Sequence, residues 1–403
     1  MTVTVPSLAR RPSARKPPLR VAHVNANFVA GAGGITLREA LAVDRDAFAS
    51  TILAPRGGTL FGRAEEAGLE VVRLEQMAPG RGVSPTAQLE ALRELTAELR
   101  AGRFDIVHTH GAKSGFIGRL AAHRVGVRAV VHTLHGFPFH EFHTPVTRAL
   151  LRTMERRLGR ITDYFLTDGT FVASEAVRLK IAPPGRIRAL ISSIDTVPAV
   201  TPARRSEARR LLGVPEDVKV VGTVARLADQ KAPLDMVEAF AALGRSDVYM
   251  VWVGGGELRA RTERKIRAKR LEDRFLLLGE RDDVPALLPG FDVFALSSRW
   301  EGLPCSVVEA MTCGIPVVAN AVNSVPEIVI AGRTGIVARP ADPTSLARGI
   351  AYLLDHPHDA ARMAASAREQ IGEQFRTDLI GEELMDVYET ALRLAANGRR
   401  SAR

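Results

Sequence analysis

The sequence has little cysteine and no long apolar run, and each shortage excludes a class of protein. Its 403 residues include two cysteines, Cys305 and Cys313, which are too few for a disulfide framework or a structural zinc site. No apolar run approaches the roughly 18 residues that a membrane-spanning helix needs. Residues 1–18 carry four basic side chains but no apolar segment of the length found in secretory signals. We therefore expect a cytoplasmic protein in a reducing compartment, with a disordered basic tail at 1–18.

Length and charge suggest two domains with different partners. At 403 residues the chain is long enough for two domains, each with its own core. Hydrophobic residues make up 46% and charged residues 25%, which is ordinary for a soluble globular protein. The whole net charge of +10 lies within residues 1–196. A basic half indicates an anionic partner, such as nucleic acid, an acidic membrane surface or a phosphorylated substrate.

Short β-branched runs alternate with longer amphipathic stretches, as in parallel β-α units. In the first half we expect strands at 20–25, 50–54, 71–74, 105–109, 129–134, 164–167 and 186–191. In the second half we expect them at 219–224, 248–253, 274–278, 292–296, 316–320 and 335–338. Pro198 and Pro202 mark a linker. The pattern predicts an α/β protein with two Rossmann-like domains, 19–196 and 197–375.

A glycine-rich turn follows the first expected strand. Ligands of parallel sheets bind at the carboxyl ends of strands, and here the backbone N–H groups of Gly33 and Gly34 can meet an anion if a helix begins near Ile35. A flexible loop is an equally good interpretation. The turn has neither the Gly-x-Gly-x-x-Gly pattern nor a Gly-Lys-Ser/Thr sequence, which argues against NAD binding and against a P-loop NTPase.

Two cations follow the first strand of the second half. Arg226 and Lys231 lie five residues apart between that strand and a helix. An arginine fork and a lysine point charge there can converge on one doubly charged group. A solvated pair of surface charges is the alternative.

Two carboxylates follow the strand expected at 292–296. Glu301 lies in the turn and Glu309 in the helix beyond it, so both can face one cleft and accept hydrogen bonds from the two sugars of a sugar nucleotide. The N–H groups of Gly302 and Leu303 between them can receive a phosphate oxygen. The alternative is a capping acid and a surface glutamate, but Glu309 is flanked by apolar residues, where a buried carboxylate needs partners.

These motifs resemble the retaining glycosyltransferases of family 4, which share the GT-B fold of two facing Rossmann-like domains. The spacing of Glu301 and Glu309 matches their Glu-x7-Glu motif, and the resemblance extends over residues 20–392, including the His-x-His sequence at 108–110. It implies that a C-terminal helix, 376–396, packs on the N-terminal domain. It also implies a UDP-sugar or another nucleotide sugar as donor of a hexose or N-acetylhexosamine.

The same resemblance assigns roles to individual residues. Arg226 and Lys231 would bind the donor diphosphate, Glu309 the ribose and Glu301 the transferred sugar. The backbone near Arg281 would meet the base, and His110 would lie beside the sugar.

Residues 108–115 and 135–142 resemble, more narrowly, transferases that extend polyprenyl-diphosphate-linked saccharides. This places the acceptor near Lys113, His135 and Phe137. The chain departs from the family pattern at Ser-Ser-Ile-Asp, 192–195, and at Asp-Gly-Thr, 168–170. A basic, partly apolar stretch at 148–160 suggests peripheral contact with an anionic membrane.

We expect no metal cofactor and no nucleic-acid partner. The histidine pairs 108/110 and 140/143 have no third ligand at a suitable spacing in the sequence. Three rival functions stay open at this point. They are glycosylation of a soluble metabolite, a nucleotide-sugar epimerase or phosphorylase of the same fold, and a basic module that binds nucleic acid or membrane through charge alone.

Overall fold

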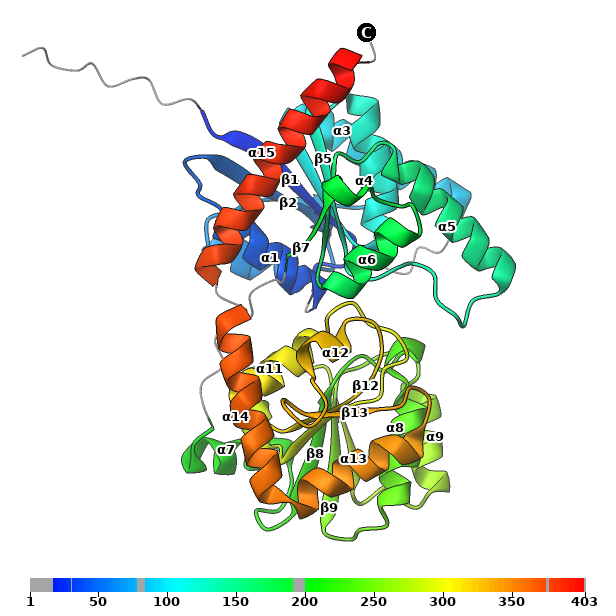
Figure 1. Ribbon diagram of the computed structural model, residues 1–403, viewed down its shortest axis with the longest axis vertical. Coiled ribbons are helices and arrows are strands. Elements are labelled where there is room, and N and C mark those ends of the chain that lie inside the picture. Colours follow the sequence, from blue (N-terminus) through cyan, green and yellow to red (C-terminus); the bar gives the residue numbers. More distant parts are fainter. Residues whose placement is uncertain (1–16, 30, 78–83, 191–199, 375–376, 402–403) are drawn as a thin grey trace, which may run out of the picture.

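The chain folds into two α/β domains, stacked one above the other in Figure 1. The coordinates are a computed structural model, which describes residues 17–29, 31–77, 84–190, 200–374 and 377–401. Residues 1–16 of the expected basic tail, most of the expected linker, and the Ser-Ser-Ile-Asp sequence at 192–195 lie outside these residues. Two parallel sheets, each with helices on its faces, confirm the expected fold class.

The N-terminal sheet has seven parallel strands in the order β3-β2-β1-β4-β5-β6-β7. The strands are β1 (Leu19–Asn25), β2 (Phe48–Pro55), β3 (Glu70–Leu74), β4 (Ile106–His110), β5 (Ala129–Leu134), β6 (Tyr164–Thr167) and β7 (Ile187–Ala189). The helices are α1 (Ala32–Ala42), α2 (Phe61–Glu66), α3 (Pro85–Gly102), α4 (Ala112–Val125), α5 (Pro145–Gly159) and α6 (Thr170–Arg178). The strand order reverses between β1 and β4, so a crevice is expected at their carboxyl ends.

The C-terminal sheet has six parallel strands in the order β10-β9-β8-β11-β12-β13. The strands are β8 (Lys219–Val224), β9 (Val248–Val253), β10 (Phe275–Gly279), β11 (Val293–Leu296), β12 (Val317–Asn320) and β13 (Ile336–Ala338). The helices are α7 (Pro202–Leu212), α8 (Pro233–Leu243), α9 (Arg259–Ala268), α10 (Val284–Leu287), α11 (Cys305–Cys313), α12 (Val325–Ile328), α13 (Pro343–Asp355) and α14 (Pro357–Gln374). Here the order reverses between β8 and β11.

The last helix, α15 (Thr377–Ser401), returns to the N-terminal domain (Figure 1). Its apolar residues recur at helical spacing, and Leu384, Val387, Tyr388 and Ala391 are buried in one core with Val21 of β1. Burial of this stripe holds the helix on the sheet. The chain thus crosses between the domains twice, as expected.

Glycines let the loops at the carboxyl edge of the second sheet interlock. Gly254 has φ 135°, and a side chain there would overlap the carbonyl oxygen of Ala225. The Leu227 amide donates to the Gly255 carbonyl at 2.7 Å. Arg226 lies between these two contacts, so the interlocked loops fix its backbone.

The two domains touch through a carboxylate that caps a helix. Glu327 of α12 accepts hydrogen bonds from the backbone N–H groups of Thr170 and Phe171, each at 2.8 Å. These groups form the N-terminus of α6, where a negative charge is favourable. A side chain at Gly169 would overlap Ser324. The Asp-Gly-Thr departure from the family pattern is therefore a point of contact between the domains.

Candidate active site

The glycine turn after β1 opens a helix earlier than expected. Helix α1 begins at Ala32, three residues before Ile35, because Gly31 takes the left-handed φ of 73° that permits a sharp turn. The first hydrogen bond of the helix runs from the Ile35 amide to the Gly31 carbonyl. Gly33 and Gly34 therefore lie in the first turn, where backbone N–H groups have no intrahelical acceptor. They are placed to meet an anion.

Lys231 and Glu301 form an ion pair between their Nζ and Oε1 atoms. Their side chains are 15% and 5% exposed, and the Gln230 amide donates to the other carboxylate oxygen at 3.3 Å. The sequence assigned the two charges to different parts of the donor, whereas the structure brings them together beside one loop. Arg226 lies nearby in sequence, at the end of β8, and is exposed.

The N-terminus of α11 lies against the N-terminal domain. A Cβ atom on Gly302 would lie 2.5 Å from the carbonyl oxygen of His135, so only glycine allows this approach. Glu309 is half-buried one turn inside α11. Burial, and then the Glu309 charge, raises the pKa of the Cys305 thiol to about 12, which makes this cysteine a poor nucleophile at neutral pH.

An aspartate that the sequence analysis missed holds His135. The Nδ1 atom of His135 lies 2.9 and 3.1 Å from the two carboxylate oxygens of Asp168. Burial acts to lower the pKa of His135, but the charge and hydrogen bond of Asp168, helped by Glu39, raise it overall. Asp168 directly follows β6. Its position at the carboxyl end of a strand is the sequence signal that points to it.

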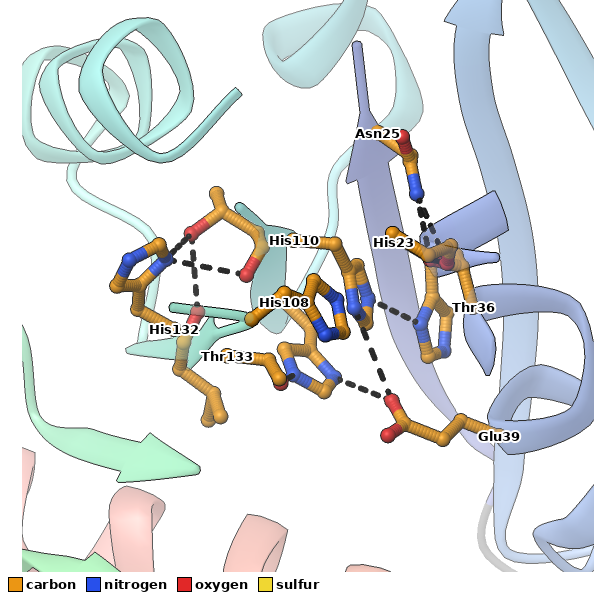
Figure 2. A network of polar contacts seen from close by, with 12 residues as sticks. His23, Asn25, Thr36, Glu39, His108, His110, His132 and Thr133 are labelled. Carbon is orange, nitrogen blue, oxygen red and sulfur yellow. Dashed lines mark hydrogen bonds and ion pairs between the residues drawn. The ribbon is translucent and has the colours of Figure 1, made fainter. Parts of the chain in front are cut away.

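Behind His135 lies a buried polar network that sequence spacing could not reveal. Figure 2 shows His23 of β1, Glu39 of α1 and His108 and His110 of β4 facing one another. The His23 Nδ1 atom lies 3.2 Å from His110 Nε2, and Glu39 Oε2 lies 3.8 Å from His110 Nδ1. Burial lowers the pKa of His23 to about 3 and raises that of Glu39 to about 8.

This network has the residue types of a metal site, with ligand-type atoms within 4.8 Å of one another. Hydrogen bonds account for every imidazole nitrogen of His23 and His108, whereas His110 Nδ1 has no hydrogen-bond partner among the described residues. His108 uses both of its nitrogens, on the Tyr388 hydroxyl at 3.0 Å and the Thr133 hydroxyl at 2.7 Å. We interpret the cluster as a network of neutral histidines. The absence of a metal cofactor stays a prediction.

Three other predicted site residues make contacts of their own. Lys113, in the first turn of α4, donates to the Met77 carbonyl at 3.3 Å. Phe137 stacks on Phe139 with ring centroids 5.1 Å apart. Arg281, in the loop after β10, forms a two-point ion pair with Asp283, so its side chain is occupied.

An aromatic contact closes one side of the domain interface. The rings of His140 and Trp300 stack with centroids 3.8 Å apart. Trp300 immediately precedes Glu301, so this contact joins the loop after β5 to the loop that carries the carboxylate. Lys231, Glu301, the Gly302 amide and His135 therefore meet where the carboxyl edges of the two sheets face each other, the position at which such sheets bind ligands.

Comparison with known proteins places this arrangement in a family. A model of the glycosyl transferase 4-like domain matches residues 30–191, and one of glycosyl transferases group 1 matches residues 204–370. The chain is 30% identical to the D-inositol 3-phosphate glycosyltransferase of Saccharomonospora viridis, over 72% of this chain and 71% of that enzyme. The chain belongs to the family 4 glycosyltransferases of GT-B fold.

Other relatives share the fold or part of the sequence. The chain is 31% identical to the UDP-Gal:α-D-GlcNAc-diphosphoundecaprenol α-1,3-galactosyltransferase of Escherichia coli, but the match spans 60% of this chain and 64% of that enzyme, just under two thirds of its length. The structure of Anabaena HepE with UDP-glucose has a TM-score of 0.79 at 20% identity, covering 92% of this chain and all of that one.

Proposed function

We propose that the protein is a retaining transferase that moves a hexose or N-acetylhexosamine from a UDP-sugar to a hydroxyl of a polyprenyl-diphosphate-linked saccharide. The meeting of Lys231, Glu301 and the Gly302 amide with His135 carries this proposal. It offers one sugar diphosphate a cation, a carboxylate that accepts hydrogen bonds from sugar hydroxyls, and an anion-binding helix end. Support for the substrates comes from HepE, which binds UDP-glucose, and from the E. coli relative, which acts on a diphosphoundecaprenol-linked sugar.

In the proposed mechanism the leaving diphosphate is stabilised where its charge develops. Arg226 and Lys231 contact the phosphates together with the amides of Gly33 and Gly34, while Glu309 holds the ribose. Glu301 binds the transferred sugar when the donor draws Lys231 toward its phosphates. The raised pKa of Cys305 removes the nearest thiol as a nucleophile. The resemblance to the retaining family implies that the acceptor hydroxyl attacks from the departing face and gives its proton to a phosphate oxygen.

A soluble acceptor is the second candidate. The Saccharomonospora viridis relative, named for D-inositol 3-phosphate, matches 72% of this chain, a longer stretch than the E. coli relative. Another relative in this group is the α-D-kanosaminyltransferase of Streptomyces kanamyceticus, which is 30% identical over 70% of this chain. An inositol phosphate is anionic, as is a lipid diphosphate. The basic N-terminal half alone therefore does not decide between them.

The exposed face of α5 supports the lipid-linked acceptor. No helix in the described part of the chain has the length and apolarity to span a bilayer. Val146 and Leu150, four residues apart on this helix, are 78% and 59% exposed. Arg157 continues the same stripe, because positions at i, i+4 and i+7 share a helix face. The stripe combines apolar and basic side chains, as peripheral membrane helices do.

Not every arginine of the stretch 148–160 faces outward. The Arg156 side chain donates to the Leu179 carbonyl at 2.6 Å, and Arg152 is half-buried, whereas Arg148 and Arg157 are exposed. A test of membrane binding should therefore change the exposed residues only.

The lipid-linked acceptor predicts binding to anionic liposomes. The protein should sediment with vesicles containing phosphatidylglycerol at low salt and be released as salt screens the charges. The double variant Val146→Asp, Leu150→Asp should stay in the supernatant. Leu89→Asp is the matched control, because Leu89 is an exposed leucine, 44% exposed, on α3, away from the stripe.

The acceptor itself gives the second arm of this test. Transfer from a UDP-sugar should be faster to a polyprenyl-diphosphate saccharide in these vesicles than to the same free saccharide. If liposomes do not bind and the soluble saccharide reacts equally well, the lipid-linked acceptor is wrong. Glycosylation of a soluble metabolite then replaces it. If UDP is released without any glycosylated product, the transferase proposal itself fails.

Donor cleavage is expected to need no divalent metal, because basic side chains and helix N-termini stabilise the negative charge of the diphosphate. Brief treatment with excess EDTA should leave the rate of UDP release nearly unchanged in a coupled assay. A loss of rate that Mg²⁺ or Mn²⁺ restores would contradict this prediction.

A further inference from the structure

We propose that Asp168 is a positioning residue that keeps the His135 imidazole charged, with its Nε2–H group available to an oxygen of the donor. The inference rests on the proposed function, because it adds a cation to the same site. It gives a role to a residue that stands where the family pattern has another side chain.

The geometry fixes one edge of the imidazole. Both carboxylate oxygens of Asp168 lie within 3.1 Å of His135 Nδ1, and the Asp168 side chain is 4% exposed. A carboxylate in this position accepts a hydrogen bond from the Nδ1–H group and fixes the ring orientation. The other ring nitrogen, Nε2, is buried and has no hydrogen-bond partner among the described residues. A charged ring therefore has one N–H group left for a ligand.

The groups around His135 come from five elements of the fold. Asp168, after β6, and Glu39, of α1, favour the charged ring, and His110 of β4 stacks on it with centroids 5.8 Å apart. The neutral neighbours His108 and His132 complete the inner side. Across the domain interface, the backbone of Glu301 and Gly302 lies against Gly136 and the backbone carbonyl of His135. Asp168 is the only carboxylate in direct contact with the ring among the described residues.

This environment matters because burial alone would keep the ring neutral. Desolvation lowers the pKa of a buried histidine, as it does for His23, His108 and His110 nearby. Asp168 reverses that effect at His135 only. The N–H group is therefore charge-assisted, and the backbone carbonyl of the same residue lies against Gly302, where in the proposed mechanism the leaving diphosphate gains charge. His135 would join Lys231 and Arg226 as a third cation.

The charge is measured directly by NMR of protein labelled with ¹⁵N-histidine. In the wild-type enzyme without substrate, the His135 signals should show a ring that stays charged to a higher pH than an ordinary histidine. In Asp168→Asn, which retains the size and hydrogen bonding of the side chain, they should show a neutral ring. His135→Gln identifies the signals. Asp163→Asn is the matched control, since Asp163 accepts from the Val130 amide at 2.8 Å at the opposite edge of the sheet.

The pH profile gives the functional readout. A group whose pKa is raised by a partner is charged below that pKa and loses its charge as the pH rises through it. In Asp168→Asn the alkaline fall of kcat/KM should therefore move to lower pH. The variant should lose about tenfold or more above neutral pH, and the activity should return only at a pH well below the ordinary histidine pKa, because burial then acts unopposed. Asp168→Glu, which restores the charge, should recover part of the activity at pH 8.

The outcomes are distinguishable. A neutral His135 in the wild-type enzyme overturns the inference whatever the enzyme transfers. A profile that falls in amplitude without moving, with the His135 signals unchanged, shows that Asp168 acts through packing alone and also overturns it. A charged ring with no sugar transfer to any acceptor contradicts the proposed function and leaves the assignment of charge in place.

Discussion

Replacing Lys231 by Ala is expected to reduce kcat/KM for the donor by about 30- to 1000-fold, the scale of removing one preorganised group from a developing charge, roughly 2 to 4 kcal/mol. The ammonium supplies a positive charge beside the leaving diphosphate. Arg226→Ala should have an effect of the same order, and the rate should be measured as UDP released from the nucleotide sugar. An active double variant, Arg226→Ala with Lys231→Ala, would mean that the donor binds elsewhere.

The two substitutions are expected to differ in their effects on the melting temperature. Arg226 is exposed, so its removal should leave the melting temperature nearly unchanged. Lys231 pairs with a carboxylate that is 5% exposed, and removing it leaves that charge unpaired at a free-energy cost of about 3 kcal/mol. The ion pair is the reason to expect a difference.

A second substitution at the pair separates charge from catalysis. Lys231→Ala together with Glu301→Gln removes both charges, so the melting temperature should return toward that of the wild-type protein while the activity stays low. A double variant that melts as low as Lys231→Ala would show that the ion pair does not stabilise the fold.

Gly302→Ala is expected to reduce kcat by about 100-fold, because a methyl group there would hold the domains apart. The added Cβ would lie 2.5 Å from the His135 carbonyl oxygen and 3.3 Å from Asp168 Oδ2. The first contact is with backbone, which no change of rotamer can relieve. A displacement of about 1 Å between catalytic groups costs on the order of 100-fold in rate.

Binding of UDP should distinguish this effect from unfolding. The expected nucleotide contacts, apart from the α1 amides, lie in the C-terminal domain, so the affinity of Gly302→Ala for UDP by calorimetry should change much less than kcat. Gly62→Ala is the matched control, since a Cβ at this helical glycine meets nothing within 4 Å. Wild-type turnover by Gly302→Ala would show that the domains are further apart during catalysis.

The sequence by itself determined the order of elements and the class of the protein. β5, β6, β8 and β9 begin and end at the predicted residues, because buried parallel strands are continuous runs of β-branched and apolar side chains. The carboxyl ends of parallel strands share one edge of a sheet, so the sequence also indicated that site residues should follow the strands. The Glu-x7-Glu spacing then indicated a sugar nucleotide.

The start of α1 shows where local pattern is insufficient. The sequence placed it near Ile35, whereas the positive φ of Gly31 starts it at Ala32. Glycine permits this backbone conformation without requiring it, so the residue type does not by itself fix the first turn.

Only the tertiary structure decided which side chains meet. His23, Glu39 and Tyr388 come from three distant parts of the chain, and they join His108 and His110 because β1 lies beside β4 and α15 returns to the same sheet. The pairing of Lys231 with Glu301 and the hold of Asp168 on His135 likewise depend on contacts far apart in sequence. Local periodicity reports which face of an element is buried. It does not report which partner that face meets, because strand order, helix crossing and domain approach are set by the packing of the whole chain.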